Sequence, residues 1–213
     1  SVLFCVLMFV GGLSWKIIGG VLAVAVPSVL VFLSIVMQEG QTLIKDYQRD
    51  RIMAFFDPAT YADTEAYQQL NSVIAIGSGQ LWGKGLNNTD IASVKNGNFL
   101  PESQTDFIFA VIGEELGFVG SAVVILLLIL IAMRCVSIAR VAKDTAGMVI
   151  AAGMGSLIGI QGFMNIAVAT MMMPNTGLPL PFVSYGLSSL VSMYIGIGFV
   201  LNVGLQRKNL YNL

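Results

Sequence analysis

Long apolar stretches with almost no charge are the feature that most constrains this chain. Residues 17–37, 147–173 and 182–206 contain no charged side chain, and residues 107–133 contain only Glu114 and Glu115. Each stretch reaches the roughly 20 residues that a helix needs to cross a bilayer. Charged residues make up 11% of the chain, against about 25% in an ordinary soluble domain. The sequence therefore predicts a membrane protein, and it excludes a soluble enzyme, a nucleic-acid-binding domain and a disordered chain.

A fifth apolar stretch, residues 2–13, is too short to cross. The predicted fold class is all-α, a polytopic transmembrane helix bundle of about four full spans plus one truncated span. Because Ser1 lies inside an apolar run, residues 1–213 are interpreted as a single C-terminal fragment of a longer membrane domain. Residues 38–106 form a large loop, and residues 107–213 contain the last three spans.

The distribution of charge predicts the orientation of the spans. The short segments at 14–16, 134–146 and 207–208 together carry six basic residues and one acidic residue, whereas the long loop carries nine acidic and five basic residues. Short segments rich in Lys and Arg stay in the cytoplasm. We therefore expect a multi-pass cell-membrane protein whose loop at 38–106 is extracytoplasmic and whose C-terminus is cytoplasmic.

The composition also excludes several kinds of catalytic site. The chain has no histidine, which removes Ser-His-Asp triads and histidine-ligated metals. Cys5 and Cys135 lack CxxC spacing and are interpreted as apolar membrane residues rather than a disulfide or zinc site. The glycine-rich residues 77–85 match neither the P-loop nor the dinucleotide pattern, so no nucleotide site is predicted.

Acidic residues cluster where the long loop meets residues 107–133. Carboxylates at membrane depth usually face a pocket or a partner, so Asp106 is a candidate catalytic residue and Glu102 and Glu114 are candidate substrate-binding residues. Asp106 also fits a helix-capping box that begins at Ser103. Glu114 also fits an interface anchor or an internal ion pair with a missing upstream helix. The alternative for Glu102 is a solvated acid, or one paired with a base of the loop.

Three basic residues are candidates for binding a phosphate or pyrophosphate, because cationic side chains match its oxygens: Arg49, Arg51 and Lys84. A solvated helix beside the membrane is the alternative for Arg49 and Arg51, and a flexible turn is the alternative for Lys84.

Ser184 follows a proline-rich connector at residues 173–182. Non-helical backbone at membrane depth lines a cavity or is buried in protein, so Ser184 is a further candidate for substrate binding. Gln161 and Asn165 lie four residues apart on one helical face and are expected to form interhelical hydrogen bonds.

Several longer motifs resemble the SEDS family, the bacterial shape, elongation, division and sporulation proteins of RodA, FtsW and SpoVE type. They are DYQR at 46–49, IAIGSG at 74–79, GKG at 83–85, LPE at 100–102, TDFIFA at 105–110, GEELG at 113–117 and GLPLPFVSYG at 177–186. These motifs cover essentially the whole chain in order. The chain resembles the C-terminal half of a ten-span protein of this family. One departure is Leu187, where many members have glycine.

The resemblance implies a peptidoglycan glycosyltransferase that polymerises lipid II into glycan strands at the outer face of the membrane, for cell shape, elongation or division. It implies a class B penicillin-binding protein as transpeptidase partner, with other cell-wall synthesis membrane proteins and no nucleic acid. Asp106 corresponds to the family's essential loop aspartate and is the expected general base. The residues themselves indicate no metal site, and a divalent cation at the pyrophosphate is left open.

Two other functions are open at this point. One is a flippase for the lipid-linked peptidoglycan precursor, although the uncharged spans supply no polar path by themselves. The other is a non-catalytic scaffold of the cell-wall synthesis complex. Because upstream spans are expected to form half of the cavity, the fragment is predicted to be inactive alone.

Overall fold

The computed structural model describes residues 2–36, 46–64, 66–86 and 104–206. These residues form helices joined by turns, with no strand among them, which confirms the predicted all-α class. The helices are α1 (Val2–Val10), α2 (Trp15–Val36), α3 (Asp46–Phe56), α4 (Tyr67–Ser78), α5 (Ile108–Arg140), α6 (Thr145–Ala169) and α7 (Leu187–Leu205).

Three long helices form the membrane part of the described structure. Helices α5, α6 and α7 have 33, 25 and 19 residues, and each is apolar enough to cross a bilayer. Helix α2 has 22 residues, but the apolar part that the structure describes covers only Gly19–Phe32. A fourth full span therefore stays a prediction. Helix α1 has nine residues, fewer than a bilayer crossing needs.

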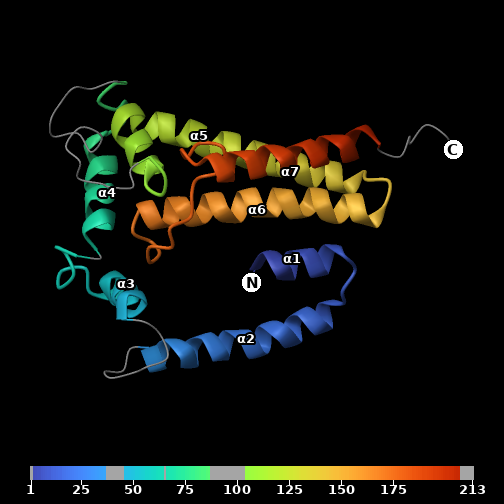
Figure 1. Cartoon of the computed structure of the whole chain (residues 1–213), viewed down its shortest axis with the longest axis horizontal. Coiled ribbons are helices and arrows are strands. Elements are labelled where there is room, and N and C mark those ends of the chain that lie inside the picture. The colour runs from blue at the N-terminus through green and yellow to red at the C-terminus, as the bar shows by residue number, and fades with distance from the viewer. Residues whose placement is uncertain (1, 37–45, 65, 87–103, 207–213) are drawn as a thin grey trace.

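Helix α6 lies in the middle of the bundle, with α1 on one side and α5 and α7 on the other (Figure 1). Its most extensive contact is with α5. A Cβ atom at Gly155 of α6 would lie only 2.9 Å from the carbonyl oxygen of Ala132 and 3.0 Å from Cβ of Cys135. Small residues let membrane helices approach this closely, and Leu128 and Ile158 fill the core between the same two helices.

Helix α4 lies across the C-terminal end of α6. The side-chain amide of Gln69 donates to the carbonyl oxygens of Val168, at 3.0 Å, and Met173, at 2.8 Å. The Ser72 hydroxyl donates to the carbonyl oxygen of Ala169, at 2.7 Å. The last carbonyls of a helix have no partner within it. Helix α4 therefore provides hydrogen-bond donors to carbonyl groups at the C-terminal end of α6.

Helix α5 is interrupted at Gly117, whose backbone has φ 66° and ψ −163°. That region of backbone conformation is essentially restricted to glycine. The break removes the two helical hydrogen bonds that would run from the N–H groups of Phe118 and Val119 to the carbonyls of Glu114 and Glu115. Helix α5 therefore consists of two segments that meet at Gly117.

Residues 80–85 insert at this break and replace the lost bonds. Four backbone hydrogen bonds join the two segments: Phe118 N to Gln80 O (2.8 Å), Val119 N to Leu81 O (3.2 Å), Lys84 N to Glu114 O (2.9 Å) and Gly85 N to Glu115 O (3.0 Å). Backbone polar groups at membrane depth must be paired. The exchange makes the break tolerable and fastens the extramembrane loop to α5.

Glycines make this insertion possible. A Cβ atom at Gly79 would overlap the carbonyl of Gly113, and a Cβ atom at Gly83 would overlap the carbonyl of Glu115. Gly83 also has φ +77°, a conformation that L side chains rarely adopt. The contact is therefore one of backbone against backbone.

We predict that Gly83→Ala destabilises the protein by about 2 kcal/mol or more, because the methyl group adds backbone strain and pushes the loop away from Glu115. The midpoint of unfolding in detergent measures the effect. Gly77→Ala is the matched control, since a Cβ there meets nothing within 4 Å and alanine favours the helix. Equal midpoints for the two variants would contradict the prediction.

Candidate functional site

Asp106 lies in a turn that immediately precedes α5. The turn covers residues 104–107, and the helix has Phe107 as its N-cap, without a side-chain capping bond. The alternative in which Asp106 occupies the third position of a capping box is therefore wrong. The completely buried ring of Phe107 lies at the helix start in place of a polar cap. Asp106 itself is half-buried.

The connector between α6 and α7 approaches this turn closely. Gly177 has φ +64°, and a Cβ atom built on it would lie 3.3 Å from Oδ2 of Asp106. The Asp106 carboxylate therefore lies beside the backbone of the connector, at a point where the absence of a side chain leaves room. The sequence motif GLPLPFVSYG and the aspartate motif TDFIFA are separated in the chain and meet here.

Polar groups of α6 and the connector bind the turn through its backbone. Asn165 Nδ2 donates to the Asp106 carbonyl oxygen at 2.7 Å. Ser184 Oγ donates to the Thr105 carbonyl oxygen at 2.6 Å, and the Tyr185 N–H donates to the Gln104 carbonyl oxygen at 2.8 Å.

Gln161 and Asn165 both bind the connector rather than a neighbouring helix. Gln161 Nε2 donates to the Pro179 carbonyl oxygen at 2.9 Å, and Asn165 Nδ2 donates to the Leu178 carbonyl oxygen at 2.7 Å. The predicted interhelical hydrogen bonds are thus replaced by bonds to the non-helical backbone that follows α6, because its prolines and turns leave carbonyls unpaired.

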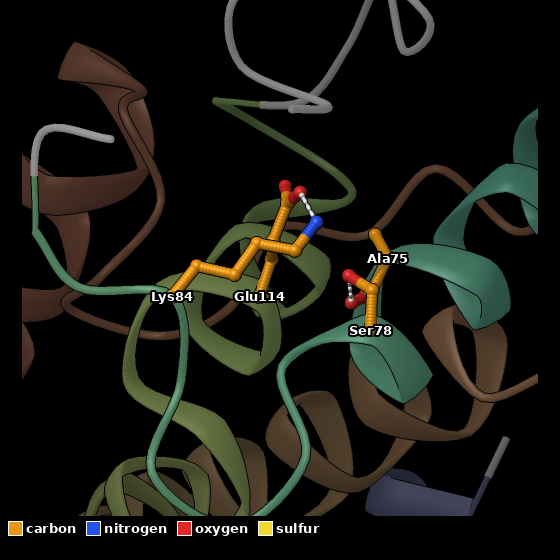
Figure 2. A network of polar contacts seen from close by, with 4 residues as sticks. All are labelled: Ala75, Ser78, Lys84 and Glu114. Carbon is orange, nitrogen blue, oxygen red and sulfur yellow. Dashed lines mark hydrogen bonds and ion pairs between the residues drawn. The ribbon is translucent and has the colours of Figure 1, made fainter. Parts of the chain in front are cut away.

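Lys84 and Glu114 form an ion pair at the inserted loop. Their Nζ and Oε1 atoms are 2.7 Å apart, with side-chain exposures of 29% and 2% (Figure 2). The sequence left open an ion pair between Glu114 and a missing upstream helix, but the partner that the structure gives is Lys84, from the loop of the same chain. The same view shows Ser78 bonded to the Ala75 carbonyl oxygen at 2.7 Å, at the end of α4.

The two predicted arginines are not brought to Asp106. Arg49 and Arg51 belong to α3, which Figure 1 shows apart from the start of α5. Arg49 is half-buried, and its Nε atom is buried without a hydrogen-bond partner. Glu102 lies outside the described residues. Across the ranges that the structure covers, no three acidic or cysteine side chains group as metal ligands.

An apolar groove of about 750 Å³ runs along α5 where it faces α4 and α6. Its lining includes Phe109, Phe118, Leu126 and Ile166. Phe109 follows Asp106 by three residues in the chain. A groove of this kind suits the apolar part of a ligand.

The family model for cell cycle proteins of the FtsW, RodA and SpoVE type matches residues 1–209. The chain belongs to this family. The resemblance drawn from the motifs is confirmed, and with the three apolar helices the family identifies a multi-pass membrane protein.

Relatives with curated names are similar over almost the whole chain. The peptidoglycan glycosyltransferase MrdB of Escherichia coli K12 is 41% identical over 203 residues, which cover 95% of this chain and 52% of MrdB. The probable peptidoglycan glycosyltransferase FtsW of Nitrosomonas europaea is 38% identical over 205 residues, which cover 95% and 50%. The chain spans about half the length of these family members.

A solved structure of the same kind is also similar. It is described as the structural coordination of polymerization and crosslinking by a peptidoglycan synthase complex, and it matches with a TM-score of 0.69 at 29% identity. The match covers 96% of this chain and 53% of the other. The family fold is therefore present in this chain.

We predict an asymmetry between the two members of the ion pair. Lys84→Met removes the lysine partner of the buried Glu114 carboxylate, which we expect to cost about 3 kcal/mol. Glu114→Gln leaves a lysine that reaches water, and we expect a smaller loss of about 1 kcal/mol. Unfolding in detergent measures both.

The double variant Lys84→Met with Glu114→Gln serves as the control and should be more stable than Lys84→Met alone, because no charge is then buried. A Glu114→Gln loss as large as that of Lys84→Met would show that the buried charge is not the cause.

Proposed function

We propose that the complete protein polymerises lipid II into peptidoglycan glycan strands, with Asp106 as the general base. The observation that carries the proposal is the position of Asp106, half-buried at the start of a membrane helix and beside the open backbone of Gly177. The names of the family relatives, peptidoglycan glycosyltransferases in two bacteria, support the same activity.

The reaction requires a carboxylate at such a place. A hydroxyl of the acceptor sugar attacks the anomeric carbon of the donor sugar and forms the new glycosidic bond. The bond from that carbon to the lipid pyrophosphate breaks, and the pyrophosphate leaves with the electron pair. Asp106 accepts the hydroxyl proton as the new bond forms. The apolar groove whose lining includes Phe109 supplies a surface for the isoprenoid part of the substrate.

The departing pyrophosphate needs positive charge. Arg49, Arg51 and Lys84 are the proposed residues, and a divalent cation is the alternative. Lys84 is paired with Glu114, so it would reach a pyrophosphate only by sharing or exchanging that partner. Glu102 and Glu114 complete the proposed substrate-binding set, whereas Ser184, the further candidate from the sequence, donates to the Thr105 carbonyl oxygen.

The proposed setting is the outer face of the cell membrane. The loop at 38–106 is then extracytoplasmic and the C-terminus cytoplasmic, as the distribution of basic residues favours. A class B penicillin-binding protein is the proposed transpeptidase partner within a cell-wall synthesis complex that serves shape, elongation or division. The similarity to a peptidoglycan synthase complex supports such a partnership.

We predict that Asp106→Asn abolishes polymerisation of lipid II by the complete purified protein while leaving its unfolding midpoint unchanged, because the amide keeps the shape but takes no proton. Gel analysis of the glycan product measures the activity. Asp63→Asn, at an exposed position in the turn before α4, is the matched control and should stay active.

Two outcomes would contradict the proposal. Scrambling of lipid II without any polymer would favour the flippase, and normal growth of cells that depend on Asp106→Asn would favour the scaffold. Polymerisation by the 213-residue chain alone would contradict the expectation that further spans complete the cavity.

The orientation gives a separate prediction. In a cysteine-free background, a cysteine at Asp63 should react with a membrane-impermeant maleimide in intact spheroplasts, because that turn faces outward. A cysteine at Lys143, in the turn between α5 and α6, should react only after the membrane is opened. The reverse pattern would invert the topology and remove Asp106 from the outer face.

A further inference from the structure

We propose that Asn165 and Ser184 are positioning residues that set the direction of the Asp106 carboxylate through the backbone of its turn. This inference rests on the proposed function. It gives the Ser184 hydroxyl a structural hydrogen bond within the protein in place of a contact with the substrate. Its basis is that three successive carbonyls, those of Gln104, Thr105 and Asp106, each accept a hydrogen bond from α6 or from the connector.

The side-chain amide of Asn165 donates hydrogen bonds to two segments that are far apart in the chain. It is 1% exposed, and Nδ2 donates to the Asp106 and Leu178 carbonyl oxygens, each at 2.7 Å. An Asn amide has two N–H donors, and both are used. Oδ1 is buried without a partner. Rotating the amide by 180° would place that oxygen against two carbonyls, so a single orientation is stable.

Ser184 also forms hydrogen bonds with two segments, and its partner in the turn is Thr105, one residue before Asp106. Its hydroxyl donates to the Thr105 carbonyl oxygen and accepts from the Leu180 N–H, each at 2.6 Å. The side chain is 1% exposed, and its oxygen already has a donor and an acceptor. A group used in this way is poorly placed to bind a sugar, and well placed to hold the turn against the connector.

Fixing these carbonyls fixes the direction in which the Asp106 side chain leaves the backbone. The buried Phe107 ring holds the next residue, so the turn is restrained on both sides of Asp106. Gly177 lies against the carboxylate, and the distance between them depends on the same bonds. A misplacement of about 1 Å in a catalytic group costs about 100-fold in rate.

Gln161 is the control position that distinguishes positioning of Asp106 from support of the connector alone. It lies one turn before Asn165 on α6 and donates to the Pro179 carbonyl oxygen at 2.9 Å. This hydrogen bond holds the connector, whereas the carbonyls of residues 104–106 accept from other residues. Gln161→Met and Asn165→Leu each replace an amide by an apolar side chain of similar size. If support of the connector were the only role, the two variants would behave alike.

The experiment uses the complete protein with lipid II. We expect Asn165→Leu and Ser184→Ala to lower kcat for polymerisation by about 10- to 100-fold, with lipid II binding within about twofold of the parent. Ser184→Thr, which keeps the hydroxyl, should recover most of the kcat lost in Ser184→Ala. Gln161→Met should retain kcat within about twofold. Hydrogen exchange at the amides of residues 105–107 should be faster in Asn165→Leu and Ser184→Ala only.

An equal fall of kcat in Gln161→Met, unchanged kcat in Asn165→Leu and Ser184→Ala, or a loss confined to lipid II binding would overturn the inference. If Asn165→Leu does not fold, the Ser184→Ala and Ser184→Thr pair decides by the same criteria. A parent protein that makes no polymer rejects the proposed function and the catalytic role together. Hydrogen exchange then still reports whether the two residues restrain the turn, so the two failures are distinguishable.

Discussion

The exchange of backbone hydrogen bonds at Gly117 is the interaction on which the rest of the structure depends. A membrane helix normally pairs every backbone group within itself. Here α5 gives up two bonds, and residues 80–85 return four. The loop is therefore fastened to the helix by its backbone, and the ion pair between Lys84 and Glu114 forms as a consequence of that registration.

The need to pair backbone polar groups also explains the contacts at the C-terminal end of α6. Helix α6 ends where the connector begins, and its final carbonyls and those of the connector need donors. Gln69 and Ser72 of α4 supply some of them, and Asn165 of α6 supplies others. Buried side-chain amides and hydroxyls thus convert non-helical backbone at membrane depth into a rigid platform beside Asp106.

Much of the fold was predictable from the sequence because hydrophobic length is a local property. The uncharged stretches at 147–173 and 182–206 correspond to α6 and α7, and the stretch at 107–133 corresponds to most of α5. The motif around Asp106 suggested this residue as the candidate general base. The capping box was wrong because spacing alone does not reveal that the helix begins at Ile108, after the buried Phe107.

What the sequence by itself determined is the class of protein, the positions of α5 to α7 and the family, since these follow from apolar length and from contiguous motifs. Only the tertiary structure decided which donors hold the Asp106 turn and which base pairs with Glu114. Those partners are 59, 79 and 30 residues apart along the chain. No periodicity or spacing links residues that far apart, because their contact depends on how whole helices pack.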